Sequence, residues 1–412
     1  MNFLFELLDN RKNQGAYKLF CVLACAYMAI NFIMAFCEIF FCSGVHAYMA
    51  AHHFLNYHFG IVPRAFYGAT IGELTQILPK ALYFILWLLI CCIPYIVYFC
   101  VYLRMRKSSN NVDNLDAFAV FSLLLPTTFL PLNDFLRLDI VLLNWFVLCA
   151  LVVWSRHWCR FLIPFIMIIM TLTHEGAIFM FLPTLCGMAF YKSEKKIDFA
   201  LTGWLCFGVL CSLIVYLFIS RTPISWQEID AFLQKRNTFG ELVKGELTLK
   251  SHIESVQHGY LLWTITKGFT PAVSMKILFA IPFFSIALAI VLYAWYAIYN
   301  TAKDNVYLKW KIIFLFFTTL SNICLFIGCD YNRWVWSWLS VNILLLFLLF
   351  GDKNIKQIAP IKQKHKYFFT IALLIFLLTG TGDCHSFTKF TRLCGEAAGY
   401  TIQKICNCLQ NK

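Results

Sequence analysis

The stretch GCDYNRWVWSW, residues 328–338, lies between two apolar runs and carries an acid, an amide and a guanidinium. The runs on either side, residues 312–327 and 335–350, are apolar enough to lie in lipid. We therefore expect Asp330 and Arg333 in a tight turn between two membrane helices. Charges at that depth are costly and are usually paired or functional.

A purely structural interpretation of this turn is an Asp–Arg salt bridge that closes a helical hairpin. Trp334, Trp336 and Trp338 would then form an interfacial aromatic belt. The same arrangement of acids and arginines recurs at other turns on the same side of the predicted membrane. This repetition favours a functional role for the set of turns.

Composition indicates an integral membrane protein. Of 412 residues, 60% are hydrophobic, 18% aromatic and only 13% charged, which is typical of a chain in lipid rather than of a soluble protein with a large core. The net charge of +13 lies in short clusters beside apolar runs. We interpret these clusters as the positive-inside topology signal and predict no nucleic-acid partner. We also expect no cleavable signal peptide, because residues 1–18 are polar and basic.

The predicted fold is all-α and polytopic, a single membrane domain over residues 1–412 with about eleven spans. The spans cover residues 19–42, 81–103, 117–132, 140–155, 161–172, 177–191, 201–220, 277–299, 312–327, 335–350 and 367–379. Basic clusters place the N-terminus in the cytoplasm and the tail, residues 383–412, outside. We expect the cytoplasmic turns to hold only lysines, arginines and solvated polar residues.

Four of these spans, between residues 117 and 191, are unusually short. At about 12 to 16 residues they fall below the roughly 20 needed to cross the hydrocarbon. We expect their outer turns to lie within the membrane boundary and to line a protein-walled cavity. Residues 221–275 are the one large hydrophilic segment, predicted as a helical external loop because Ser225 and Glu228 have capping-box spacing.

Cysteines and histidines give no metal signal. Cys384, Cys394, Cys406 and Cys408 lie in the external tail, where disulfides could form with a pairing that the sequence leaves open. His46, His52 and His58 recur every six residues, which does not place all three on one helical face, so we predict no metal site and no cofactor. We expect His52 or His53 to be an ordinary interfacial residue.

Charged and titratable side chains gather at the predicted outer turns. The first external loop, residues 43–80, is rich in histidine, and later turns carry the motifs NDFLRLD, THEG and DYNRW. The candidate site residues in these segments are His58, Arg64, Asp134, Arg137, Asp139, His174, Glu175, Asp330 and Arg333. This one-sidedness predicts a reaction or binding centre on the external side.

The three arginines in this set suit a phosphate-type leaving group. Arginine binds phosphate bidentately and stays charged, so Arg64, Arg137 and Arg333 could hold a diphosphate at the headgroup level. His58, Asp134 and Asp330 are assigned to the same binding set. In the empty protein the counter-ions would be Asp134, Asp139, Glu175 and Asp330.

Three other residues are candidates for the catalytic proton transfer. Asp139, His174 or Glu175 would take the proton from an attacking hydroxyl. His174 and Glu175 are adjacent and would diverge by about 100° on a helix, so we expect one of them to face a given substrate atom.

At these motifs the sequence resembles a known group. GIVPRAFYG before the second span, THEG and DYNRW are similar to segments of membrane proteins of bacterial surface-polysaccharide loci. That group comprises the Wzy-type O-antigen and capsule repeat-unit polymerases and the GT-C-like glycosyltransferases. The likeness extends over most of the chain in span count and in the large late external loop.

The resemblance implies a GT-C-like fold in the bacterial inner membrane, with the C-terminus in the periplasm. It implies transfer of a glycan from an undecaprenyl-diphosphate carrier to an acceptor sugar hydroxyl at the outer face, with a chain-length regulator protein as a partner. The arginine-then-glycine spacing of some polymerases is not found in residues 221–275, and no Asp-x-Asp follows the first span. A GT-C transferase with a polyprenyl-phosphate sugar donor therefore remains an alternative.

Two functions of other classes are also compatible with the composition. A transporter or flippase for a lipid-linked oligosaccharide would be expected to carry charges near the midplane, whereas here they gather at outer turns. A structural subunit of a membrane assembly would not need acids and arginines at four separate outer turns. The placement of the charges favours the enzyme.

Overall fold

The structure is a computed structural model. It describes residues 65–109, 138–155, 158–174, 176–193, 198–219, 288–302, 305–324 and 331–355, with shorter pieces at 22, 29, 33, 36, 53, 115–116, 118–119, 122 and 136. For residues 219, 323–324 and 331–335 it describes the backbone alone. Every element in the described part is a helix and none is a strand, which confirms the predicted all-helical class.

The helices follow the predicted apolar runs. They are α4 (Ala65–Gly68), the 3-10 helix η2 (Ile71–Gln76), α5 (Lys80–Ser108), α8 (Asp139–Ser155), the 3-10 helix η4 (Trp158–Leu162), α9 (Ile163–Thr173), α10 (Ala177–Lys192), α11 (Phe199–Ile219), α17 (Val306–Thr319), α18 (Ser321–Cys324) and α19 (Tyr331–Phe350), together with Leu288–Thr301. The runs predicted at 140–155, 177–191 and 201–220 are helices, with small shifts at their ends.

Two predicted boundaries were wrong. Arg333 lies in the first turn of α19 rather than in a tight turn, because no glycine or proline separates it from the apolar run that follows. The run predicted at 312–327 begins earlier, at Val306, so that Lys309 and Lys311 are part of α17. The predicted span 367–379, the loop 221–275 and the tail with its cysteines lie outside the described residues.

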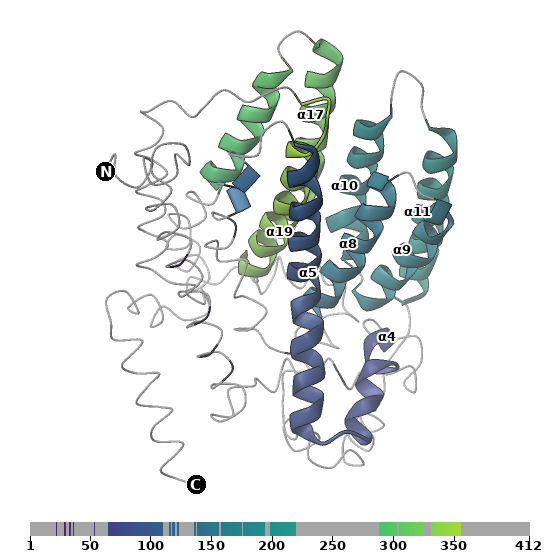
Figure 1. Cartoon of the computed structure of the whole chain (residues 1–412). Coiled ribbons are helices and arrows are strands. Elements are labelled where there is room, and N and C mark those ends of the chain that lie inside the picture. The colour runs from purple at the N-terminus through teal and green to yellow at the C-terminus, as the bar shows by residue number, and fades with distance from the viewer. Residues whose placement is uncertain are drawn as a thin grey trace, which may run out of the picture.

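The shortness of the central helices is confirmed. α8, α9 and α10 have 17, 11 and 16 residues. α8 packs against α9 and α10, α9 against α11, and α10 against α17. α8, α9, α10 and α11 form the right half of the bundle in Figure 1, and α17 lies at its upper centre.

Contacts between helix ends show the direction of each helix. The Ser109 hydroxyl donates to the Phe350 carbonyl at 2.7 Å, where α5 and α19 both end. Lys311, near the start of α17, donates to the Tyr191 carbonyl at the end of α10. α5, α8, α10 and α19 therefore run one way, and α9, α11 and α17 run the other way (Figure 1). We call the end of the bundle where α5, α10 and α19 end the basic end, because Arg106, Lys107 and Lys192 lie there, and the opposite end the distal end.

α19 lies in the core. Every residue from Trp336 to Phe350 is buried, as expected for a helix that is apolar on all sides. Trp336 and Trp338 are 5% and 1% exposed. The interpretation of these two tryptophans as an interfacial belt was therefore wrong, because the surrounding helices cover them.

Polar side chains join α19 to three neighbours. The Trp295 indole N–H donates to Asn342 Oδ1 at 2.7 Å, and the Trp338 indole N–H donates to Thr319 Oγ1 at 3.1 Å. The Tyr98 hydroxyl of α5 donates to the Ser340 carbonyl at 3.1 Å. Hydrogen bonds of this kind hold helices together where apolar contacts give no selective attraction, as in lipid.

Two of the described helices, Lys80–Ser108 and Phe199–Phe218, are long and apolar enough to cross a membrane. Along α5 the large exposed apolar side chains are Leu82, Ile85, Leu89, Ile93, Ile96, Phe99 and Leu103. Their spacing of three or four residues keeps them on one face, which at about 1.5 Å per residue is roughly 32 Å long. That length matches a hydrocarbon core of about 30 Å.

Candidate functional site

The structure describes three of the nine predicted site residues, and all three lie at the distal end. Asp139 is the first residue of α8, His174 directly follows α9, and the backbone of Arg333 is in the first turn of α19. The other six, His58, Arg64, Asp134, Arg137, Glu175 and Asp330, lie outside the described residues.

His174 is buried, 6% exposed, and its ring folds back over its own turn. Its backbone N–H donates to the Met170 carbonyl at 2.9 Å, and its Nδ1 accepts from the Gly176 N–H at 3.0 Å. A neutral imidazole that accepts at Nδ1 carries its proton on Nε2. In this arrangement the Nδ1 lone pair of His174 is already used by the Gly176 N–H.

A second histidine at this end was missed from the sequence. His53 is 1% exposed and therefore lies in the core, whereas His52, the other residue expected to be interfacial, lies outside the described residues. Its ring lies edge-on to three aromatic rings, Tyr67, Tyr83 and Trp87, with centroids 5.0, 5.7 and 4.7 Å away. We call these four residues, together with Leu136, the His53 cluster.

Both ring nitrogens of His53 are used. Nε2 lies 2.6 Å from the Leu136 carbonyl oxygen and Nδ1 lies 2.5 Å from the Tyr83 hydroxyl. A carbonyl can only accept, so Nε2 carries the proton and Nδ1 accepts from Tyr83. Burial lowers the pKa of His53 to about 4, although the hydrogen bond to the Leu136 carbonyl acts in the opposite direction. The ring is therefore neutral near pH 7.

Tyr67 is the other titratable group in the cluster. Burial, and after it the neighbouring Tyr83, raises the pKa of Tyr67 well above its usual range. Its buried hydroxyl lies near Tyr83 without a hydrogen bond of good geometry to any described residue. The cluster is thus a set of uncharged polar groups enclosed by aromatic rings.

Leu136 has an unusual backbone. Its φ of 73° is in the left-handed region, which a leucine rarely adopts, and its side chain is 1% exposed. Such a conformation costs about 1–3 kcal/mol and persists where the surroundings hold it. Leu136 and Leu138, which is also buried, flank Arg137 in the sequence. The chain on both sides of this arginine is therefore anchored in the core.

The segment after Arg64 is anchored to the same region. Ala65, the next residue, begins α4, and α4 packs against α9, the helix that His174 follows (Figure 1). Gly72 of η2 lies against the backbone of His53, since a Cβ at Gly72 would be 2.2 Å from the His53 carbonyl oxygen. The distal end thus brings together the chain next to Arg64, the chain next to Arg137 and the His174 turn.

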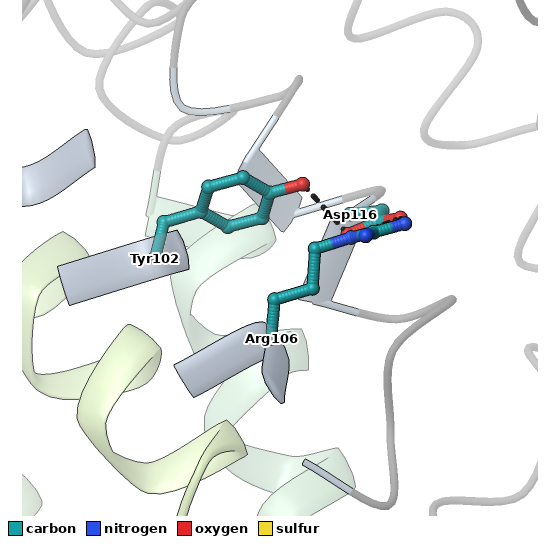
Figure 2. Close-up of polar contacts among 3 residues, drawn as sticks. All are labelled: Tyr102, Arg106 and Asp116. Atoms are coloured by element: carbon teal, nitrogen blue, oxygen red, sulfur yellow. Dashed lines mark hydrogen bonds and ion pairs between the residues drawn. The ribbon is translucent and has the colours of Figure 1, made fainter. Parts of the chain in front are cut away.

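Side chains at the basic end also make specific contacts that the sequence did not predict. The Arg106 guanidinium donates from Nε to Asp116 Oδ1 at 3.0 Å and from Nη2 to Oδ2 at 3.2 Å, and the Tyr102 hydroxyl donates to Oδ1 at 2.8 Å (Figure 2). Asp116 is 6% exposed. This group joins the end of α5 to the helical residues around Asp116.

Two further cations at this end are held by protein groups. Lys311 is 6% exposed and donates to the carbonyls of Tyr191 and Ser193, which end α10. Lys192 pairs with Asp352 at 3.7 Å. The sequence predicted lysines and arginines at these turns but not their partners, which lie far away in the sequence for both side chains.

No group of three or more His, Cys, Asp or Glu side chains able to hold a metal ion is found among the described residues. Comparisons of the chain with protein-family models, curated proteins and solved structures found no match.

Proposed function

We propose that the protein is a membrane glycosyltransferase of the polysaccharide-polymerase type. It moves a glycan from undecaprenyl diphosphate to an acceptor sugar hydroxyl at the outer face of a bacterial inner membrane, which corresponds to the distal end. In this orientation the N-terminus is cytoplasmic and the basic end faces the cytoplasm, as the positive-inside rule expects.

The observation that carries the proposal is the convergence of outer segments at the distal end. The hydrogen bond from His53 to Leu136 joins the first external loop, residues 43–80, to the outer turn that contains Arg137. The segment after Arg64 forms α4, which packs against α9, the helix that His174 follows. Arginines delivered to one place near lipid need an anionic partner. A carrier diphosphate supplies that charge when it is bound.

The exposed apolar face of α5 supports a lipid-linked substrate. The exposed apolar face of α5 runs from Leu82 to Leu103 and gives a polyprenyl chain a continuous path in lipid up to the distal end. The charged diphosphate would then lie at headgroup level, within reach of side chains at that end.

In the proposed reaction the acceptor hydroxyl oxygen attacks the anomeric carbon of the glycan. The bond from that carbon to the diphosphate oxygen breaks, and undecaprenyl diphosphate leaves with the electron pair. Asp139 or Glu175 takes the proton of the attacking hydroxyl. Arg64, Arg137 and Arg333 stabilise the charge that develops on the diphosphate, and His174 donates from Nε2.

The test is polymer formation in cells. Arg333→Ala and Glu175→Gln should abolish polymer, by roughly 10² or more in rate, while single repeat units stay on the carrier and protein levels stay unchanged. Arg104→Ala, at the exposed basic end of α5, is the matched control and should leave polymer length unchanged. Polymer of wild-type length in the Arg333→Ala strain would overturn the mechanism.

The same experiment separates the alternatives. If the protein is a flippase, the same variants should leave no lipid-linked repeat units at the outer face, because the substrate would not be carried there. If the protein is a transferase with a polyprenyl-phosphate donor, the variants should make a repeat unit that lacks one sugar, and the linkage between units should still form.

A further inference from the structure

We propose that His53 is a positioning residue that holds the segment containing Arg137 and Asp139 against the first external loop, residues 43–80. The inference rests on the proposed function for its consequence, since these two segments would carry part of the diphosphate and proton-transfer set. Its structural content stands on contacts within the His53 cluster.

His53 does not touch substrate in this arrangement. Its ring is 1% exposed, its Nε2–H is given to Leu136 and its Nδ1 is occupied by Tyr83. The two hydrogen bonds span 83 and 30 residues of sequence. His53 therefore acts as a link between three segments: its own, the start of α5 and the chain before α8.

The link is directional. Tyr83 donates to Nδ1 and thereby keeps the ring proton on Nε2, where it is needed for the Leu136 carbonyl. The edge-on rings of Tyr67, Tyr83 and Trp87 fix the ring plane. Few arrangements of the imidazole can satisfy both nitrogens, so the ring holds Leu136 in one orientation.

Leu136 needs such a constraint. A leucine at φ 73° is strained, and its carbonyl direction follows from that conformation. If the His53 donor is lost, the turn can relax toward an ordinary backbone conformation. Leu138, whose carbonyl accepts from the Leu142 N–H at 3.0 Å in the first turn of α8, would shift with it.

Hydrogen exchange measures the positioning directly. In the full-length protein in lipid nanodiscs, amides of residues 136–142 should exchange on the order of tenfold faster in His53→Leu than in wild type, because a buried acceptor loses its donor. His53→Gln should stay near wild type, since the glutamine Nε2 can donate to the same carbonyl. Equal exchange in wild type and His53→Leu would overturn the inference, as would equal acceleration in both variants.

The ring proton gives a second readout that packing alone would not move. A ¹⁵N-histidine spectrum of wild type minus that of His53→Gln should show a neutral ring with its proton on Nε2. Tyr83→Phe should leave the proton on Nε2, because the Leu136 carbonyl can only accept, and should move the Nδ1 signal toward that of an acceptor without a donor. A proton on Nδ1 in the wild type would overturn the inference.

Binding of undecaprenyl diphosphate then separates the inference from the proposed function. Affinity should fall about tenfold in His53→Leu and recover in His53→Gln, if one lost hydrogen bond displaces the arginine segment. Faster exchange in His53→Leu with unchanged binding would support the positioning and overturn the proposed site. Unchanged exchange would overturn the positioning whatever the binding result.

Discussion

The carboxylate of Asp116 accepts both an Nε and an Nη2 hydrogen bond from Arg106, at 3.0 and 3.2 Å. Asp116 is buried, whereas the Arg106 side chain is 50% exposed, so solvent screens part of the attraction. Among the described residues, this pair links the end of α5 to the helical residues that follow it.

Asp116→Asn should lower stability, because it removes the charge that Arg106 pairs with. We expect about 1 kcal/mol, a value at the weak end for a charged hydrogen bond because Arg106 is half in solvent. The unfolding temperature of purified protein would report it. Arg104→Gln on the same helix is the control, and an equal shift in both variants would contradict a specific role for the pair.

The Lys311 ammonium, from α17, caps the C-terminus of α10 by donating to its last carbonyls. A cation is favourable at this position because the C-terminal end of a helix dipole is negative. Lys311→Met should leave two carbonyls without this donor and cost about 1–3 kcal/mol. Lys309→Met is the matched change two residues earlier, where the ammonium lies over the Tyr299 ring at 5.5 Å. That control should cost about 0.5 kcal/mol. Urea unfolding in mild detergent would compare them, and similar costs would argue against the capping role.

Gly187 allows α10 to approach α17 closely. A Cβ there would be 2.2 Å from Thr318 Oγ1 and 3.1 Å from two of its carbons, and a β-branched side chain has little freedom to move. Gly187→Ala should therefore destabilise by about 1–3 kcal/mol despite the better helix propensity of alanine. Gly203→Ala in α11 meets no atom within 4 Å and should be neutral or stabilising. A thermal shift of the same sign in both would refute the tight contact.

Stability should depend on pH through His53. Its pKa is about 4 in the fold and 6.5 when unfolded, so the unfolded chain binds more protons between these values. The contribution of neutral His53 to the free energy of unfolding is then fully present above pH 6.5. It falls as the pH drops toward 4, by roughly 3 kcal/mol in total.

His53→Gln should remove that component of the pH dependence, because glutamine does not titrate. Denaturant unfolding of both proteins at pH 7, 5.5 and 4.5 would show it as a shallower profile for the variant. Parallel profiles would mean that His53 is protonated in the fold or exposed.

The sequence predicted the helices well where hydropathy alone decides them. α8, α10 and α11 follow unbroken apolar runs, and each is found with small shifts at its ends. α19 was placed correctly over residues 335–350, but its start at Tyr331 was missed because the polar residues Asn332 and Arg333 look like a turn in a hydropathy pattern.

The polar links could not be predicted in the same way. His53 reaches Tyr83 and Leu136, and Lys311 reaches Tyr191, across long stretches of sequence. A local pattern does not show which distant group will face a side chain. His53 looked like one of several histidines in a loop, and Lys311 looked like a topology signal, until packing gave each a partner.

The central claim is that Arg64, Arg137 and Arg333 hold one diphosphate at the distal end. Its most direct test is the binding of undecaprenyl diphosphate to the purified protein in lipid nanodiscs, measured by native mass spectrometry for wild type, for each arginine changed singly to glutamine, and for Arg104→Gln. One ligand should bind per chain, each of the three variants should lose about tenfold or more in affinity, as expected for a lost charged hydrogen bond, and Arg104→Gln should bind as wild type does. Affinities within about twofold of wild type in all three distal variants would contradict the claim.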